Sequence, residues 1–144
     1  MELPYNVEAE KQVLANMIFS SDMLVETFSR LVEEDFYTPE HRIIFSTLKA
    51  IYDNNNAKIE PYALIDKLSI DGNLDKVGDA AYILELVSSY IDLANAKYYI
   101  NSVEEKAILR KLILTAGNIV NKWSVESSGD ISNYINKIEK DITD

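Results

Sequence analysis

The sequence contains no cysteine, only four glycines and three prolines, and a single histidine. Without cysteine the chain can form neither a disulfide framework nor a thiolate metal site, which fits a reducing compartment. No hydrophobic run approaches the roughly 18 residues of a membrane-spanning helix. The first residues also lack the basic and then apolar layout of a signal peptide. We therefore expect a cytoplasmic protein that does not associate with a membrane.

Basic residues are also in short supply, with 14 Lys and Arg against 24 Asp and Glu and a net charge of −10. Such a charge repels phosphate and gives no counterion release on DNA, so we expect direct DNA contact to be absent or weak. Plain solubility explains the acidic balance better than attraction of a basic partner. Lys106, Arg110 and Lys111 form the best basic cluster. We interpret it as a solvated or inter-subunit face, and the sequence leaves DNA contact by it open.

The residues that carry catalysis are missing as well. The glycines are too far apart for the Gly-x4-Gly-Lys-Ser/Thr phosphate loop, so no nucleotide site is predicted. His41 has no second histidine or cysteine with which to hold a metal, and we assign it a structural or surface role. The acidic run at 33–35 favours a solvated turn over a cation site. We predict no catalytic residue, cofactor or metal in these residues.

What the sequence does contain is helical spacing of apolar residues, with no sustained two-residue alternation. We predict an all-α fold, with a compact head of about five to six helices at 1–94. A long helix and a return helix would then form a helical hairpin at 95–144. Residues typical of helix starts mark the head helices. These residues are Asn6, Ser21 with Asp22, Thr38 with Pro39, Pro61, and Asp79.

The predicted hairpin carries more apolar surface than two helices need. Burying five large side chains of the return helix contributes at most about 7–15 kcal/mol, whereas ordering roughly 12 residues costs around 18 kcal/mol. We therefore predict that the hairpin docks on a second copy through two-fold contacts, and the alternative is ordinary packing within one chain. The predicted interface residues are Leu109, Leu112, Ile113, Ala116, Ile119, Val120, Trp123, Ile131, Tyr134, Ile135, Ile138 and Ile142.

Three segments in order resemble a known family. They are Pro4-Tyr5-Asn6-Val7-Glu8-Ala9-Glu10, the stretch Asp35-Phe36-Tyr37-Thr38-Pro39-Glu40-His41-Arg42-Ile43-Ile44-Phe45, and Asn95-Ala96-Lys97-Tyr98-Tyr99. From Pro4 to about Ile142 the chain resembles the N-terminal domain of the bacterial replicative DNA helicase, the DnaB family. It departs from that family at Ala15 and Asp79, where glycine is usual.

The resemblance implies a place in the primosome. In the family this domain precedes a RecA-like motor that uses ATP and Mg, which these residues do not include. Six copies form a ring whose N-terminal tier pairs subunits through helical hairpins, and the tier binds the C-terminal domain of a DnaG-type primase and, in some bacteria, a helicase loader. By motif, Glu8 and Tyr82 fall where primase contacts cluster. Glu8 has a competing role as a first-turn carboxylate that supports its helix.

Our leading hypothesis is therefore an assembly and primase-docking domain of a replicative DNA helicase, without catalytic activity of its own. The alternative is a stand-alone helical adaptor, such as a phage or plasmid protein that binds primase or the helicase ring. An open reading frame that continues into a Walker motif would favour the helicase.

Overall fold

The computed structural model describes residues 2–126 and 131–143. Within these ranges the fold is all-α, as predicted, and no strand occurs. No helix in the same ranges combines the length and apolar character that crossing a bilayer requires. The elements are α1 (Val7–Phe19), α2 (Ser21–Arg30), η1 (Glu33–Asp35), α3 (Pro39–Asn55), α4 (Pro61–Ile70), η2 (Asp75–Val77), α5 (Asp79–Ser89), η3 (Leu93–Asn95), α6 (Ala96–Glu126) and α7 (Ile131–Thr143).

Most helix starts lie where the local sequence signals place them. Pro39 and Pro61 occupy the first turns of α3 and α4, as predicted. The N-cap of α2 is Ser20 rather than Ser21, and its hydroxyl accepts from the Met23 N–H at 3.3 Å. The predicted cap at Asp79 is also shifted by one residue, because the preceding glycine occupies the N-cap position of α5. Both errors are of the size expected from capping signals alone.

Asn6 caps α1 and also ties it to α6. Its side-chain oxygen accepts from the Ala9 N–H at 3.0 Å, and its amide nitrogen donates to the Ser102 hydroxyl at 3.0 Å. We expect Asn6→Ala to lower the free energy of unfolding by about 1–2 kcal/mol, because both hydrogen bonds are lost. Urea denaturation measures this value. Asn6→Asp keeps the cap and should lose less, so equal losses in the two variants would contradict this role.

The chain forms two compact units, residues 5–107 and residues 2–4 with the described part of 108–143. The helix α6 runs through both units. Its first twelve residues belong to the larger unit, in which Arg30 donates to the Asn101 side chain at 2.5 Å and pairs with Glu104 at 3.2 Å. The division into head and hairpin after residue 94 stays a prediction from sequence.

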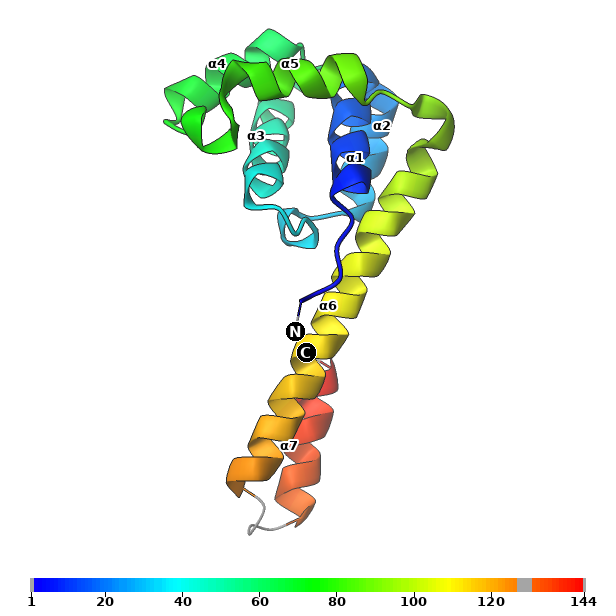
Figure 1. The fold of residues 1–144 in the computed structure, drawn as a ribbon, viewed down its shortest axis with the longest axis vertical. Coiled ribbons are helices and arrows are strands. Elements are labelled where there is room, and N and C mark those ends of the chain that lie inside the picture. The colour runs from blue at the N-terminus through cyan, green and yellow to red at the C-terminus, as the bar shows by residue number, and fades with distance from the viewer. Residues whose placement is uncertain (1, 127–130, 144) are drawn as a thin grey trace. The chain divides into compact units, whose positions relative to one another are not determined.

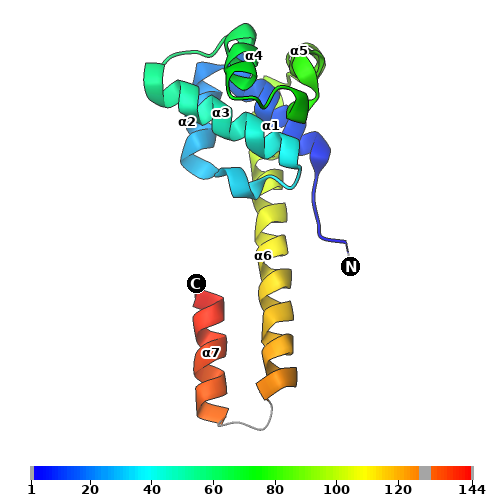
Figure 2. The same ribbon diagram turned by 90° about the vertical axis from the view of Figure 1, so that its left-hand side faces the viewer.

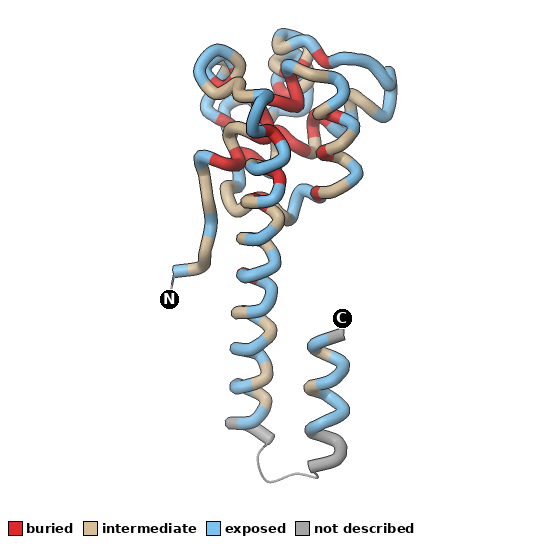
Figure 3. Tube along the Cα trace, turned by 90° about the vertical axis from the view of Figure 1, so that its right-hand side faces the viewer, coloured by how far each residue is buried: buried red, intermediate tan, exposed pale blue. Residues whose placement is uncertain are grey.

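In the larger unit α1 occupies the centre and packs against α2, α3 and α5 (Figure 1). The buried residues gather between these helices and include Leu14 and Ala15 of α1 and Ile44 of α3 (Figure 3). Ile100 and Val103 of α6 complete the same core. This packing fixes the starts of α1, α3 and α5 relative to one another.

In the smaller unit the later part of α6 and the helix α7 lie side by side and run in opposite directions (Figures 1 and 2). The Lys122 ammonium pairs with the Asp141 carboxylate at 2.5 Å and joins the two helices. The long helix and the return helix of the sequence prediction are therefore both present. We also predict a turn at 127–130 from the sequence Ser-Ser-Gly-Asp, and these residues lie outside the described ones.

Arg110 does not lie on a solvated face, which was one of the two positions predicted for its cluster. Its side chain is buried, and its guanidinium donates to the Pro4 carbonyl at 3.0 Å. The neighbouring Lys111 is exposed and Lys106 is half-buried. An arginine stem packs well against apolar surface, so a charge at helical spacing does not by itself indicate a solvated face.

Candidate protein-docking site

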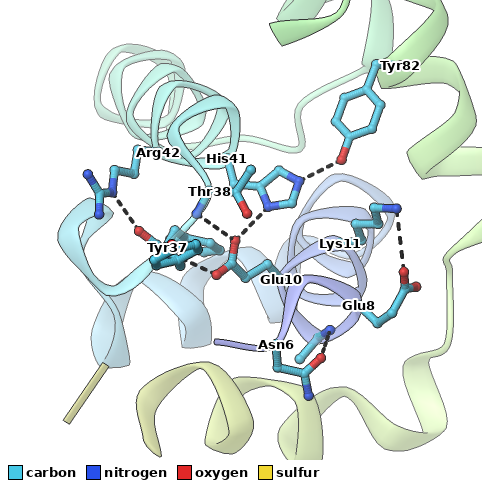
Figure 4. Close-up of polar contacts among 11 residues, drawn as sticks. Asn6, Glu8, Glu10, Lys11, Tyr37, Thr38, His41, Arg42 and Tyr82 are labelled. Carbon is cyan, nitrogen blue, oxygen red and sulfur yellow. Dashed lines mark hydrogen bonds and ion pairs between the residues drawn. The ribbon is translucent and has the colours of Figure 1, made fainter. Parts of the chain in front are cut away.

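Glu10 points into the larger unit rather than toward solvent. It lies on the same face of α1 as the buried Val13 and Leu14, and its side chain is 2% exposed. Its carboxylate accepts from the backbone N–H groups of Tyr37 at 2.8 Å and Thr38 at 3.3 Å, immediately before α3 (Figure 4). A buried carboxylate therefore satisfies N–H groups at the positive end of a neighbouring helix.

His41 and Tyr82 extend this arrangement across three helices (Figure 4). His41 is fully buried, and its Nδ1 lies 2.8 Å from the Glu10 carboxylate. Because a carboxylate only accepts, Nδ1 carries the proton. In the neutral imidazole Nε2 is then the acceptor, and the Tyr82 hydroxyl, 2.6 Å away, donates to it. The His41 and Tyr82 rings are nearly parallel, with centroids 6.0 Å apart. Glu10 of α1, His41 of α3 and Tyr82 of α5 thus form one continuous hydrogen-bonded series.

The ionisation states of Glu10 and Tyr82 keep Glu10 a hydrogen-bond acceptor and Tyr82 a hydrogen-bond donor. Burial raises the pKa of Glu10, but the hydrogen bonds from His41, Tyr37 and Thr38 outweigh it and hold that pKa below its ordinary value. Burial raises the pKa of Tyr82 to about 12, against the opposing charge of Lys11. At neutral pH Glu10 is a carboxylate and Tyr82 keeps its proton. His41 has no exposed surface, and Tyr82 is the end of the series that reaches the surface.

Glu8 and Tyr82, the two residues predicted to contact a partner, lie on either side of Lys11 (Figure 4). The Lys11 ammonium lies 3.6 Å from the Glu8 carboxylate and 3.4 Å from the Tyr90 hydroxyl, to which it donates. Its charge also acts on Tyr82. Glu8 is 63% exposed and Tyr82 is half-buried. The structure brings both residues to one surface formed by α1 and α5, which we call the α1–α5 surface.

The start of α5 is shaped around Tyr82. Gly78 has a φ of 95°, and a Cβ at this position would lie 3.1 Å from the Tyr82 Cβ. Any larger residue at 78 would therefore be strained and would crowd the tyrosine. Asp79 also has a positive φ of 63°, a conformation that glycine adopts more readily. This conformation gives a physical reason for the glycine that is usual in the family at this position.

The smaller unit holds the predicted hairpin residues. Ile113, Ile119 and Ile138 are half-buried, while the side chains of Ile131 and Tyr134 lie outside the described residues. The exposed ones are Leu109, Leu112, Ala116, Val120, Trp123, Ile135 and Ile142. A hollow of about 420 Å³ lies between α6 and α7, and Ile108, Leu112, Ala116, Ile119 and Ile142 supply its apolar lining. This unit alone leaves a broad apolar surface in water.

Sequence reasoning missed Glu10 as a site residue and named it only as part of a family motif. A signal was present, because Glu10 precedes Val13, Leu14 and Met17 by three, four and seven residues, and all three are buried. A carboxylate on the apolar face of a helix predicts a buried partner, for which His41 is the natural candidate in this sequence.

Comparisons with known proteins identify the family. Residues 2–105 match the model of the DnaB-like helicase N terminal domain. The replicative DNA helicase DnaB of Leifsonia xyli is 30% identical over 139 residues, which cover 96% of this chain and 30% of that protein. The Haemophilus influenzae DnaB is 33% identical over 140 residues, with the same two coverages. The chain thus spans less than a third of the length of these relatives.

A solved structure agrees with the sequence comparisons. The crystal structure of the N-terminal domain of DnaB helicase from Mycobacterium tuberculosis matches with a TM-score of 0.90 and 27% identity, over 99% of this chain and 100% of that one. The resemblance stated from the sequence motifs is confirmed. Because the family model matches well over half of the chain, the protein belongs to the DnaB-like helicase N-terminal domain family.

Proposed function

We propose that this chain is the assembly and primase-docking domain of a replicative DNA helicase. Its family membership supports this role, and its relatives are replicative DNA helicases. The sequence has no phosphate-binding loop, so ATP and Mg would bind in a motor domain of the full-length protein. In that context the domain is the non-catalytic tier of a hexameric ring that unwinds DNA in the cytoplasm. It holds subunits together and recruits primase, so that priming stays close to the fork.

The assembly role is supported chiefly by the apolar surface of the smaller unit. Leu109, Leu112, Ile135 and Ile142 are each between 43% and 64% exposed. A monomeric protein rarely leaves large apolar side chains gathered in this way, and a second hairpin offers a matching surface. Two-fold pairing of identical hairpins would bury the apolar surface of both copies in one self-complementary interface.

The docking role is supported by the α1–α5 surface. Tyr82 presents a rigid aromatic ring there, and Lys11 and Glu8 supply charges beside it. Aromatic residues with few rotatable bonds are common at the centres of protein interfaces. We assign this surface to the C-terminal domain of a DnaG-type primase, and the same tier would receive a helicase loader.

We expect Tyr82→Ala to weaken binding of the cognate primase C-terminal domain by about 1–3 kcal/mol, because truncation removes the aromatic contact. Isothermal titration calorimetry with the purified domain measures the affinity. Tyr62→Ala serves as the matched control, since Tyr62 is 73% exposed and belongs to α4 rather than to α1 or α5. Wild-type affinity of a folded Tyr82→Ala variant would remove Tyr82 from the docking site.

A further inference from the structure

The buried pair of Glu10 and His41 contributes nothing directly to the α1–α5 surface, yet it reaches that surface through Tyr82. A buried carboxylate and imidazole are costly to desolvate, and apolar side chains of similar volume stabilise a core at least as well. The pair therefore does something that apolar packing would not do. Its distinctive effect is to give the Tyr82 hydroxyl a fixed acceptor below the surface.

Each member of the series is held by the next. Among the described residues His41 is the hydrogen-bond partner of the Tyr82 hydroxyl, at 2.6 Å. His41 is in turn held by the Glu10 carboxylate at Nδ1. Glu10 is held by the Tyr37 and Thr38 N–H groups, which belong to the backbone at the start of α3. The orientation of the Tyr82 phenol is thus fixed, through His41 and Glu10, by the backbone at the start of α3.

Further contacts also confine the Tyr82 side chain. Gly78 approaches the Tyr82 Cβ, and the His41 ring lies nearly parallel to the phenol. Rotation of Tyr82 to another rotamer would break the bond to Nε2 and leave that nitrogen buried without a partner. The native rotamer is therefore favoured before any partner binds.

We infer that Glu10 and His41 are positioning residues that preorganise Tyr82 for docking. This inference rests on the proposed function, because it concerns the affinity of the same surface for the primase domain. A side chain already held in its bound rotamer loses less entropy on association, so the buried series raises affinity without touching the partner. The Tyr82 hydroxyl acts inward, on His41, while the ring face meets the partner.

A double-mutant cycle tests this inference. Tyr82→Phe keeps the ring and removes the hydroxyl, and His41→Asn keeps a donor for Glu10 while removing the acceptor for Tyr82. Each single variant should bind the primase C-terminal domain about three- to ten-fold more weakly, as expected when one side chain must be ordered on binding. In the Tyr82→Phe background His41→Asn should weaken binding by less than about two-fold, because its effect passes through the missing hydroxyl.

Other outcomes overturn the inference. If the fold-losses in affinity of the two single variants multiply in the double variant, His41 acts on affinity independently of Tyr82. If a folded Tyr82→Phe variant binds as tightly as wild type, the hydroxyl has no role, whatever His41→Asn does. If Tyr82→Phe alone weakens binding and His41→Asn does not, the hydroxyl contacts the partner directly.

Two comparisons separate this inference from other failures. Leu24→Ala destabilises the core from α2, which contributes no residue to the series, and should keep wild-type affinity; it controls for general loss of stability. If wild type itself does not bind the primase domain, the proposed function fails. If wild type binds and Tyr82→Ala weakens binding while the cycle is additive, the proposed function stands and only the positioning role is lost.

Discussion

Replacement of Glu10 by alanine is expected to lower the free energy of unfolding by about 3–5 kcal/mol, because it breaks a buried hydrogen-bond network and leaves three donors without an acceptor. The variant leaves the Tyr37 and Thr38 N–H groups and the His41 Nδ1–H without an acceptor, and His41 is fully buried. Urea unfolding followed by circular dichroism at pH 7 measures the change. This is the largest effect on stability that we expect from any one residue of the site.

Glu8 provides a matched control, since it is a glutamate in the same turn of α1 but is 63% exposed. Glu8→Ala should change the free energy of unfolding by no more than about 0.5 kcal/mol. Similar losses in the two variants, or a loss below about 1 kcal/mol for Glu10→Ala, would contradict a structural role for the buried carboxylate.

Glu10 should also make the stability of the protein depend on pH under acidic conditions. Hydrogen bonds hold the pKa of Glu10 in the folded protein below the ordinary value of 4.5, so folding favours the ionised form. This contribution is fully present above the unfolded pKa and is lost as the pH falls through the lower folded pKa. The stability of wild type should therefore fall on acidification below about pH 4.5, more steeply than that of Glu10→Gln. Equal slopes would contradict the assignment.

The second large effect concerns assembly. Leu112→Asp should weaken self-association by about 2–4 kcal/mol, because an unpaired carboxylate would be buried in the proposed hairpin interface. Leu112 is 60% exposed, so its replacement should leave the chain itself folded. Sedimentation velocity over a range of concentrations measures the change in the dissociation constant.

Leu114 supplies the control for this experiment. It is 56% exposed on the same helix, but it lies two residues further along and therefore about 200° around the axis. Leu114→Asp adds the same charge at a position outside the proposed interface and should associate like wild type. Equal weakening by both variants would show that added charge, and not the position of the side chain, controls association.

The helices could be predicted from sequence because their boundaries depend on neighbouring residues. Asn6, Pro39 and Pro61 act within one turn of their own helix, and each lies where its residue type predicts. The break after α3 was equally local, since Asn56 adopts the left-handed conformation that asparagine tolerates at a helix end. Single-residue errors arose at α2 and α5, where adjacent residues compete for the same cap.

The site could not be predicted in the same way, because its contacts join distant parts of the chain. Glu10 and His41 are 31 residues apart, and His41 and Tyr82 are 41 apart. Nothing in the spacing of either pair indicates that they meet. The burial of Arg110 against the Pro4 carbonyl escaped prediction for the same reason, since a helix pattern shows where a side chain lies but not what covers it. The motif resemblance pointed to Tyr82 but not to the pair beneath it.

The central claim is that the hairpin joins copies of this chain. The most direct test is sedimentation equilibrium of the unmodified chain from low to high micromolar concentration. We predict an average mass that rises with concentration to at least twice that of one chain, and that returns toward one chain in Leu112→Asp. A wild-type chain that keeps the mass of a single copy throughout this range would contradict the claim.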